Sequence, residues 1–116
     1  MKFAAFLLAA LTPALAADVT GKWTAEFETA IGRQNYTYEL KVEGSKLTGK
    51  AISQRGEVAL QEGAVKGDDV SFVEVRRFQD QDVRIEYKGK VSGDEMKLTR
   101  AVGDVATTEI VARRAK

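Results

Sequence analysis

The chain contains no cysteine and no histidine among its 116 residues, and its single proline lies near the N-terminus. Without cysteine there is no disulfide and no acylated cysteine to anchor a lipoprotein. Without histidine or cysteine, the usual catalytic triads and dyads lack a base or a thiol, and zinc and copper sites lose their commonest ligands. We therefore expect a protein that is not an enzyme, with no catalytic residue, no metal and no cofactor.

Carboxylates are the remaining candidates for metal binding or for general acid and base catalysis. The pairs Asp68-Asp69 and Asp80/Asp82 lie in predicted turns and lack the oxygen-ligand spacing of a calcium loop, so turn formation is the expected role. Glu74 is the one carboxylate worth testing as a general acid or base, because burial beside Tyr87 would raise its pKa. Arg100 beside it would act in the opposite direction.

Long apolar runs are also scarce, and the longest is at the N-terminus. The run from Phe3 to Leu11 follows the positive head Met1-Lys2 and is broken by Thr12-Pro13. It is too short to span a bilayer, which takes about 20 residues. Together with the small residues Ala14 and Ala16, this is the pattern of a secretory signal peptide cleaved after Ala16.

The predicted organisation is a signal peptide over residues 1–16 and one β-barrel domain over residues 17–116, exported to a bacterial periplasm or the extracellular medium. Removal of Lys2 leaves 17 basic and 17 acidic residues, so the mature domain is neutral. A neutral surface argues against nucleic acid and against an anionic membrane as partners, because both attract a basic face. No membrane span is expected.

Apolar residues recur at every second position along most of the remaining chain, which is the period of half-buried strands. No 3.6-residue periodicity indicates a helix. The pattern predicts eight strands, over residues 21–29, 36–43, 46–53, 57–66, 69–78, 82–91, 95–102 and 106–114.

An internal repeat indicates how these strands connect. GAVKGDDVSF from Gly63 aligns with GKVSGDEMKL from Gly89, and KVEGSKLTGK from Lys41 is a looser copy. Each copy places a glycine between two apolar stretches, as a tight hairpin requires. Successive hairpins make an up-and-down meander, and eight strands can remove their edges by closing into an antiparallel β-barrel.

Pairing the strands across these turns predicts which residues face inward. Large residues then lie beside small ones, which is how a narrow barrel is filled: Phe72 beside Gly63 and Gly89, Leu98 beside Gly89, Tyr38 opposite Ala51, and Leu40 opposite Gly49. The same register aligns a polar row on four consecutive strands, with all side chains inward: Gln61, Glu74, Tyr87 and Arg100. Arg76, flanked by Ala59 and Ile85, comes next toward the longer loops.

Three interpretations of the polar row remain open. It is a self-neutralising plug, since buried charges are tolerated when they satisfy one another. A bulge in residues 69–78 instead turns Val73 and Val75 inward. The functional interpretation is a polar floor that recognises a ligand.

Gly21-Lys22-Trp23 at the start of the first strand resembles the G-x-W motif of lipocalins and related barrels. The resemblance implies that Trp23 closes one end of the barrel, with Arg114, or alternatively Arg113, packed over it. The K-L-T-G, G-x-V-x-G-D and C-terminal R-A-K phrases are similar to those of small secreted bacterial domains without an established activity. The chain departs from true lipocalins in its shortness and in lacking a disulfide and a helix after the barrel.

Tight hairpins at Gly44-Ser45, Gly67-Asp68 and Gly93-Asp94 are predicted to close one end, and longer loops surround the other. We expect a ligand, if there is one, at the mouth formed by the longer loops. The primary hypothesis is a carrier or sensor for a small, partly apolar or anionic ligand, and its candidate binding residues are Gln61, Glu74, Arg76, Tyr87, Arg100 and Tyr36. The alternative is a filled barrel that acts as a structural or protein-interaction module of the cell envelope.

Overall fold

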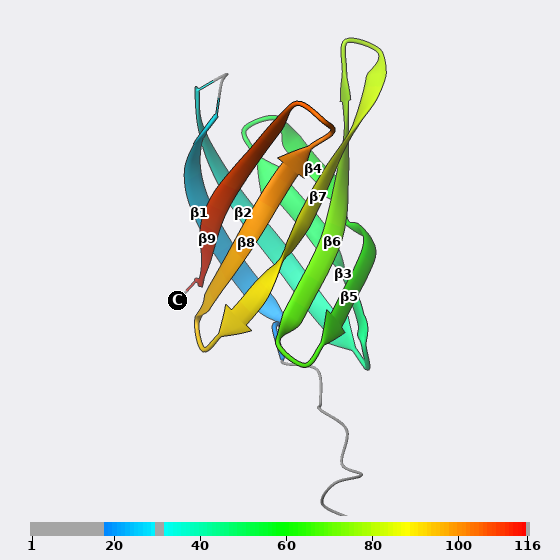
Figure 1. Cartoon of the computed structure of the whole chain (residues 1–116). Coiled ribbons are helices and arrows are strands. Elements are labelled where there is room, and N and C mark those ends of the chain that lie inside the picture. The colour runs from blue at the N-terminus through cyan, green and yellow to red at the C-terminus, as the bar shows by residue number, and fades with distance from the viewer. Residues whose placement is uncertain (1–17, 30–31, 116) are drawn as a thin grey trace, which may run out of the picture.

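The computed structural model describes residues 18–29 and 32–115, and the predicted signal peptide lies outside them. These residues form nine antiparallel strands and no helix (Figure 1). The strands are β1 (Gly21–Thr29), β2 (Gly32–Glu43), β3 (Lys46–Ser53), β4 (Gly56–Ala59), β5 (Gln61–Lys66), β6 (Asp69–Phe78), β7 (Gln81–Ser92), β8 (Glu95–Val102) and β9 (Ala106–Arg114).

The strands close into a barrel with eight positions. Consecutive strands pair with each other except β4 and β5, β1 pairs with β9, and β3 also pairs with β5, which continues to β6. β4 and β5 share one position, because both pair with β3 and are separated only at Leu60, whose N–H donates to the Gly49 carbonyl. The predicted all-β, eight-stranded antiparallel barrel is therefore confirmed.

Five predicted strands have the bounds seen in the structure, namely β1, β3, β6, β8 and β9. The expected strand over 57–66 is divided into β4 and β5, and β2 begins at Gly32 instead of residue 36. The extra residues of β2 continue the same alternation, because Gln34 is buried like Tyr36 and Tyr38. The tight turns form at residues 44–45, 67–68 and 93–94, as expected.

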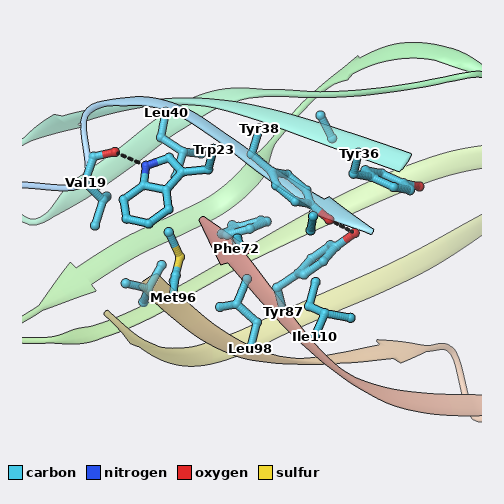
Figure 2. Packing of buried hydrophobic residues seen from close by; sticks show 14 of the residues in the cluster. Val19, Trp23, Tyr36, Tyr38, Leu40, Phe72, Tyr87, Met96, Leu98 and Ile110 are labelled. Atoms are coloured by element: carbon cyan, nitrogen blue, oxygen red, sulfur yellow. Dashed lines mark hydrogen bonds between the residues drawn. The ribbon is translucent and has the colours of Figure 1, made fainter. Parts of the chain in front are cut away.

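Trp23 closes the end of the barrel that carries these tight turns. Its side chain is fully buried, and its indole Nε1 donates to the carbonyl of Val19 at 2.9 Å. Figure 2 shows Met96 below the ring, and Phe72, Leu98, Tyr38 and Tyr87 continue the filling away from Trp23 toward the right of the view. Large buried side chains therefore occupy the barrel axis from Trp23 toward the middle.

Arg114 covers the outer side of Trp23, with Cζ 4.4 Å from the ring centroid. Its Nη1 and Nη2 donate to the carbonyls of Thr20 and Asp18, and its Nε donates to Asp94. Arg113 lies outside and pairs with Glu95. Of the two arginines considered from the sequence, Arg114 is the one that contacts the tryptophan.

We predict that Arg114→Met lowers the free energy of unfolding by about 1–2 kcal/mol, through loss of the cation–π contact and of the hydrogen bonds that hold residues 18–20. Denaturant unfolding followed by Trp23 fluorescence measures this directly, since the chain has one tryptophan. Arg113→Met removes only a surface ion pair and should change stability by less than about 0.5 kcal/mol. Equal effects of the two substitutions would contradict the closure role.

Three glycines let strands approach closely inside the barrel. Gly49 lies opposite Leu40, Gly63 opposite Leu47, and Gly89 opposite Leu98. A Cβ atom at any of the three would strike a backbone carbonyl of the facing strand. The expected pairs Leu40 with Gly49 and Leu98 with Gly89 are confirmed, and so is Tyr38 with Ala51.

The expected position of Phe72 is wrong. Phe72 pairs with Tyr87, and Gly89 pairs with Val70, so β7 is displaced by two residues from the predicted register. Gly63 has no partner on β6, because β5 departs from regular pairing with β6 between Gln61 and Ala64; on its other side it pairs with Leu47 of β3. Arg76 accordingly lies beside Val83, not Ile85.

Candidate functional site

A cluster of charged and phenolic side chains lies inside the barrel above the apolar core. Glu74 is fully buried, and Arg76 and Arg100 are 9 % and 6 % exposed. All three tyrosines of the chain take part: Tyr36, Tyr38 and Tyr87. β2, β6, β7 and β8 supply these residues, because alternation along each strand directs them to the inner face.

Glu74 is the centre of the cluster. Its Oε1 accepts a hydrogen bond from the Tyr87 hydroxyl at 2.6 Å, and its Oε2 accepts one from Tyr36 at 2.8 Å. Oε2 also accepts from Nε of Arg76, which forms an ion pair with it. Each carboxylate oxygen is thus bonded, which is the condition under which a charge can be kept in an interior.

Arg100 closes the cluster from β8. Its Nε donates to the Tyr87 hydroxyl at 3.0 Å and its Nη2 to the Tyr36 hydroxyl at 3.3 Å. The guanidinium also lies over the ring of Phe27, with Cζ 4.9 Å from the centroid. Its Nη1 bonds to no described residue and so reaches solvent, because no buried polar side-chain atom in residues 18–29 and 32–115 lacks a partner.

Arg76 connects the cluster to the strand ends at the mouth. Its Nη1 donates to the carbonyl of Gly56 and its Nη2 to that of Ala51. Burial opposes its charge, but the hydrogen bond and the charge of Glu74 raise the pKa of Arg76. The residue therefore stays a cation and its donors are used within the protein.

The cluster contains two permanent cations and one carboxylate. Arg76 is matched by Glu74, whereas Arg100 contacts only neutral phenols and aromatic faces. Within the described part of the chain, no carboxylate forms an ion pair with Arg100. An unmatched positive charge at 6 % exposure is the distinctive chemical property of this site.

Burial raises the pKa of all three tyrosines, and the carboxylate of Glu74 adds to the effect. A phenol with a raised folded-state pKa stabilises the fold fully below its unfolded pKa of about 10, and that contribution is lost as pH rises toward the folded value. We predict that stability falls above about pH 10, by up to about 1.4 kcal/mol per pH unit for each tyrosine.

The ultraviolet absorbance of phenolate measures this prediction, because the cluster contains every tyrosine of the chain. The signal should stay low in the folded protein at about pH 10–11 and appear together with unfolding. Phenolate formation at an ordinary pKa, while the circular dichroism of the barrel is unchanged, would show that the cluster is open to water.

Five of the six candidate residues meet in this cluster: Glu74, Arg76, Tyr87, Arg100 and Tyr36. Gln61 does not. It is exposed and pairs with Val73, because the irregularity in β5 shifts the pairing by one residue. A one-residue shift moves a side chain to the other face of the sheet, and Glu62 accommodates it with a φ of 51°.

The second interpretation, a bulge in residues 69–78, is wrong, because the irregular pairing lies in β5 and not in β6. Glu74 and Arg76 both join the internal cluster. Val73 is nevertheless 5 % exposed although it lies on the opposite face of β6. The two interpretations that remain are therefore a self-satisfied plug and a ligand-binding floor.

Two residues at the mouth were missed from the sequence. Phe27 lies beneath Arg100, and Gln34 pairs with Phe27 across β1 and β2. Gln34 is 8 % exposed, and its amide bonds to no described residue, so it is a free donor and acceptor at the rim. Its alternation with Tyr36 and Tyr38 indicates an inward side chain, but the sequence predicts a strand that begins only at residue 36.

Four hollows lie on the outer wall or between strand edges, and none of the four is centred on the buried cluster. Side chains fill the interior below Tyr87, so the accessible part of the site is confined to the mouth. Residues 18–29 and 32–115 contain no group of acidic residues arranged to hold a metal ion. The same ranges contain no helix able to cross a bilayer.

Comparison of the chain with protein families, characterised proteins and solved structures finds no match. The eight-stranded barrel is consistent with the lipocalin-like architecture suggested by Gly21-Lys22-Trp23. The class defined by the structure is accordingly a small, filled antiparallel β-barrel with a buried charged cluster below its mouth.

Proposed function

We propose that the protein is an exported carrier or sensor that binds a small, partly apolar anion at the mouth of the barrel. The observation that supports this is the unmatched guanidinium of Arg100. Its Nη1 reaches solvent, while its remaining bonds go to neutral hydroxyls. A carboxylate or a similar anion supplies the missing charge and accepts hydrogen bonds from a preoriented donor.

The surroundings of Arg100 suit a partly apolar ligand. Phe27 and Ile85 face the mouth from β1 and β7, and Val83 and Val102 are packed against the core while partly exposed. The amide of Gln34 adds one adaptable polar contact at the rim. Since the interior below is occupied, only the charged group of the ligand would be enclosed, and its apolar part would rest on the rim.

Octanoate is a suitable first probe, with octylamine as the control of opposite charge. We expect isothermal titration calorimetry to show saturable binding of octanoate and no binding of octylamine. Arg100→Met should abolish binding, whereas Arg77→Met, which removes an exposed arginine paired with Asp82, should not. Native mass spectrometry of the protein purified from its own source would show whether a molecule of this class is retained.

A second candidate is a filled barrel that acts as a structural or protein-interaction module of the cell envelope. The observation that favours it is that every buried polar side-chain atom of the described residues already has a hydrogen-bond partner. If octanoate does not bind, Arg100→Met changes only stability and the native mass is that of the protein alone, this second function is the better account.

A further inference from the structure

The barrel has an incomplete seam between β1 and β9. β1 pairs with β2 at nine positions and β9 pairs with β8 at eight, but β1 and β9 pair only at Trp23 with Arg114 and at Thr24 with Arg113. Figure 1 shows the two strands separating from there toward the open end. Both strands therefore have one side without ladder pairing over most of their length.

The backbone groups that face this seam can be assigned. The Lys22 carbonyl accepts a hydrogen bond from the N–H of Ala115, so Lys22 directs its backbone groups toward β9. In an antiparallel strand every second residue directs both groups to the same neighbour. Glu26 and Glu28 of β1 consequently face the seam, as do residues 107, 109 and 111 of β9.

A groove runs along the seam, with a volume of about 660 Å³. Ala25, Tyr36 and Ile110 reach it from the inner face, and their small exposed fractions show that side chains seal the interior beneath it. Glu26 and Glu109 border it from opposite sides. The groove thus combines free strand edges, an apolar floor and two bordering carboxylates. Arg33 and Arg113 also line it, and Arg113 is paired with Glu95 outside the groove.

We propose that this seam binds an extended peptide segment that carries basic residues at alternate positions. Its backbone would pair with the free edges of β1 and β9, which is the β-strand addition mode of peptide recognition. Its inward side chains would rest on Ala25 and Ile110. Its outward side chains would lie between Glu26 and Glu28 on one side and Glu109 on the other, because cross-strand neighbours share a face.

Arg33 is the internal competitor for the basic residues. It pairs with Glu26 at 2.8 Å and with Glu28 at 3.0 Å, and it lies on β2 beside the groove. Among the residues that the structure describes, only the hydroxyl of Thr99 donates a hydrogen bond to Glu109. Removing the arginine would leave all three carboxylates without a cation among the described residues, so it should increase affinity for a basic strand.

The test uses the whole protein and a short blocked peptide that alternates lysine and valine. We expect saturable binding, with hydrogen exchange of the Glu26, Glu28, Glu109 and Val111 amides slowed at least about tenfold. The same peptide N-methylated at its lysines should not bind, because it has lost every N–H donor toward one of the two edges. Arg33→Gln should tighten binding, and Glu26→Gln with Glu109→Gln should weaken it, by about threefold to tenfold each.

Glu57→Gln is the matched control. Glu57 lies on β4, away from the seam, and is an exposed carboxylate paired with Lys50 of β3. It should leave the affinity unchanged. The proposal is overturned if both peptides bind equally, if Glu57→Gln weakens binding as much as the seam substitutions do, or if no saturable binding occurs. It is also overturned if the seam amides of the free protein exchange as slowly as those of β7.

Discussion

Replacing Glu74 by alanine should lower the free energy of unfolding by about 3–5 kcal/mol, the range for removing one partner of a buried ion pair. The substitution leaves Arg76 and Arg100 as two buried cations without a carboxylate, and it deprives the hydroxyls of Tyr36 and Tyr87 of their acceptor. Domains are stable by only about 5–15 kcal/mol, so the loss is a large part of the total.

Denaturant unfolding followed by circular dichroism measures the effect, with Glu57→Ala as the control. Glu57 is exposed, and its pair with Lys50 should be worth less than about 1 kcal/mol. Glu74→Gln separates charge from shape, because the amide keeps an acceptor of similar size. We expect it to fall between the two alanine variants, since one oxygen still accepts a hydrogen bond but the charge is gone.

A Glu74→Ala protein as stable as the control variant would show that water or neighbouring groups solvate the two arginines. The cluster would then be an open polar cavity and not a packed network. That outcome would support the proposal of a ligand site at the mouth, because a polar cavity that ordered side chains do not fill has room for a ligand.

The faces of the strands could be predicted from the sequence because side-chain direction has a period of two. Phe72, Glu74 and Arg76 are inward although β7 is displaced by two residues from the expected register. An even displacement changes the neighbours of a residue and leaves its face unchanged. The buried set was therefore accessible from alternation alone, even where the pairing was wrong.

The face of Gln61 could not be predicted from alternation. The irregularity in β5 is an odd displacement, so it reverses the face of the residues before it. The positive φ of Glu62 marks the site in the structure, but Glu62 is not a residue type that indicates such a conformation. Local sequence could not locate this irregularity, which lies in a segment that pairs with both β3 and β6.

Contacts between side chains on opposite walls of the barrel could likewise not be predicted from the sequence. The Tyr38 hydroxyl of β2 donates a hydrogen bond to the Tyr87 hydroxyl of β7 at 3.0 Å, and these two strands are not neighbours in the sheet (Figure 2). Their meeting depends on the stagger of the strands around the closed barrel, which fixes which layers face each other. The inward direction of Tyr36 could be predicted, but its hydrogen bond to Glu74 could not.

Gly89→Ala is the second substitution with a large expected effect, because the added Cβ would be placed directly on the carbonyl oxygen of Lys97. The Cα atom of Leu98 is also closer than a carbon contact allows, at 2.8 Å. Both obstacles are backbone, so no side chain can rotate away. Relief requires β7 and β8 to separate within a continuous ladder, and we expect a loss of about 3 kcal/mol or more in the free energy of unfolding.

Gly93→Ala distinguishes this clash from the loss of a flexible residue. Gly93 lies in a tight turn with a φ of 62°, and nothing lies within 4 Å of an added Cβ. Its substitution should cost about 1–2 kcal/mol, the strain of an ordinary residue in left-handed geometry. A larger loss of stability for Gly89→Ala, where no such strain is involved, would establish close strand approach as a requirement of this barrel. Equal losses would mean that β7 and β8 can separate at little cost. The interior would then be less tightly packed than the buried rings indicate.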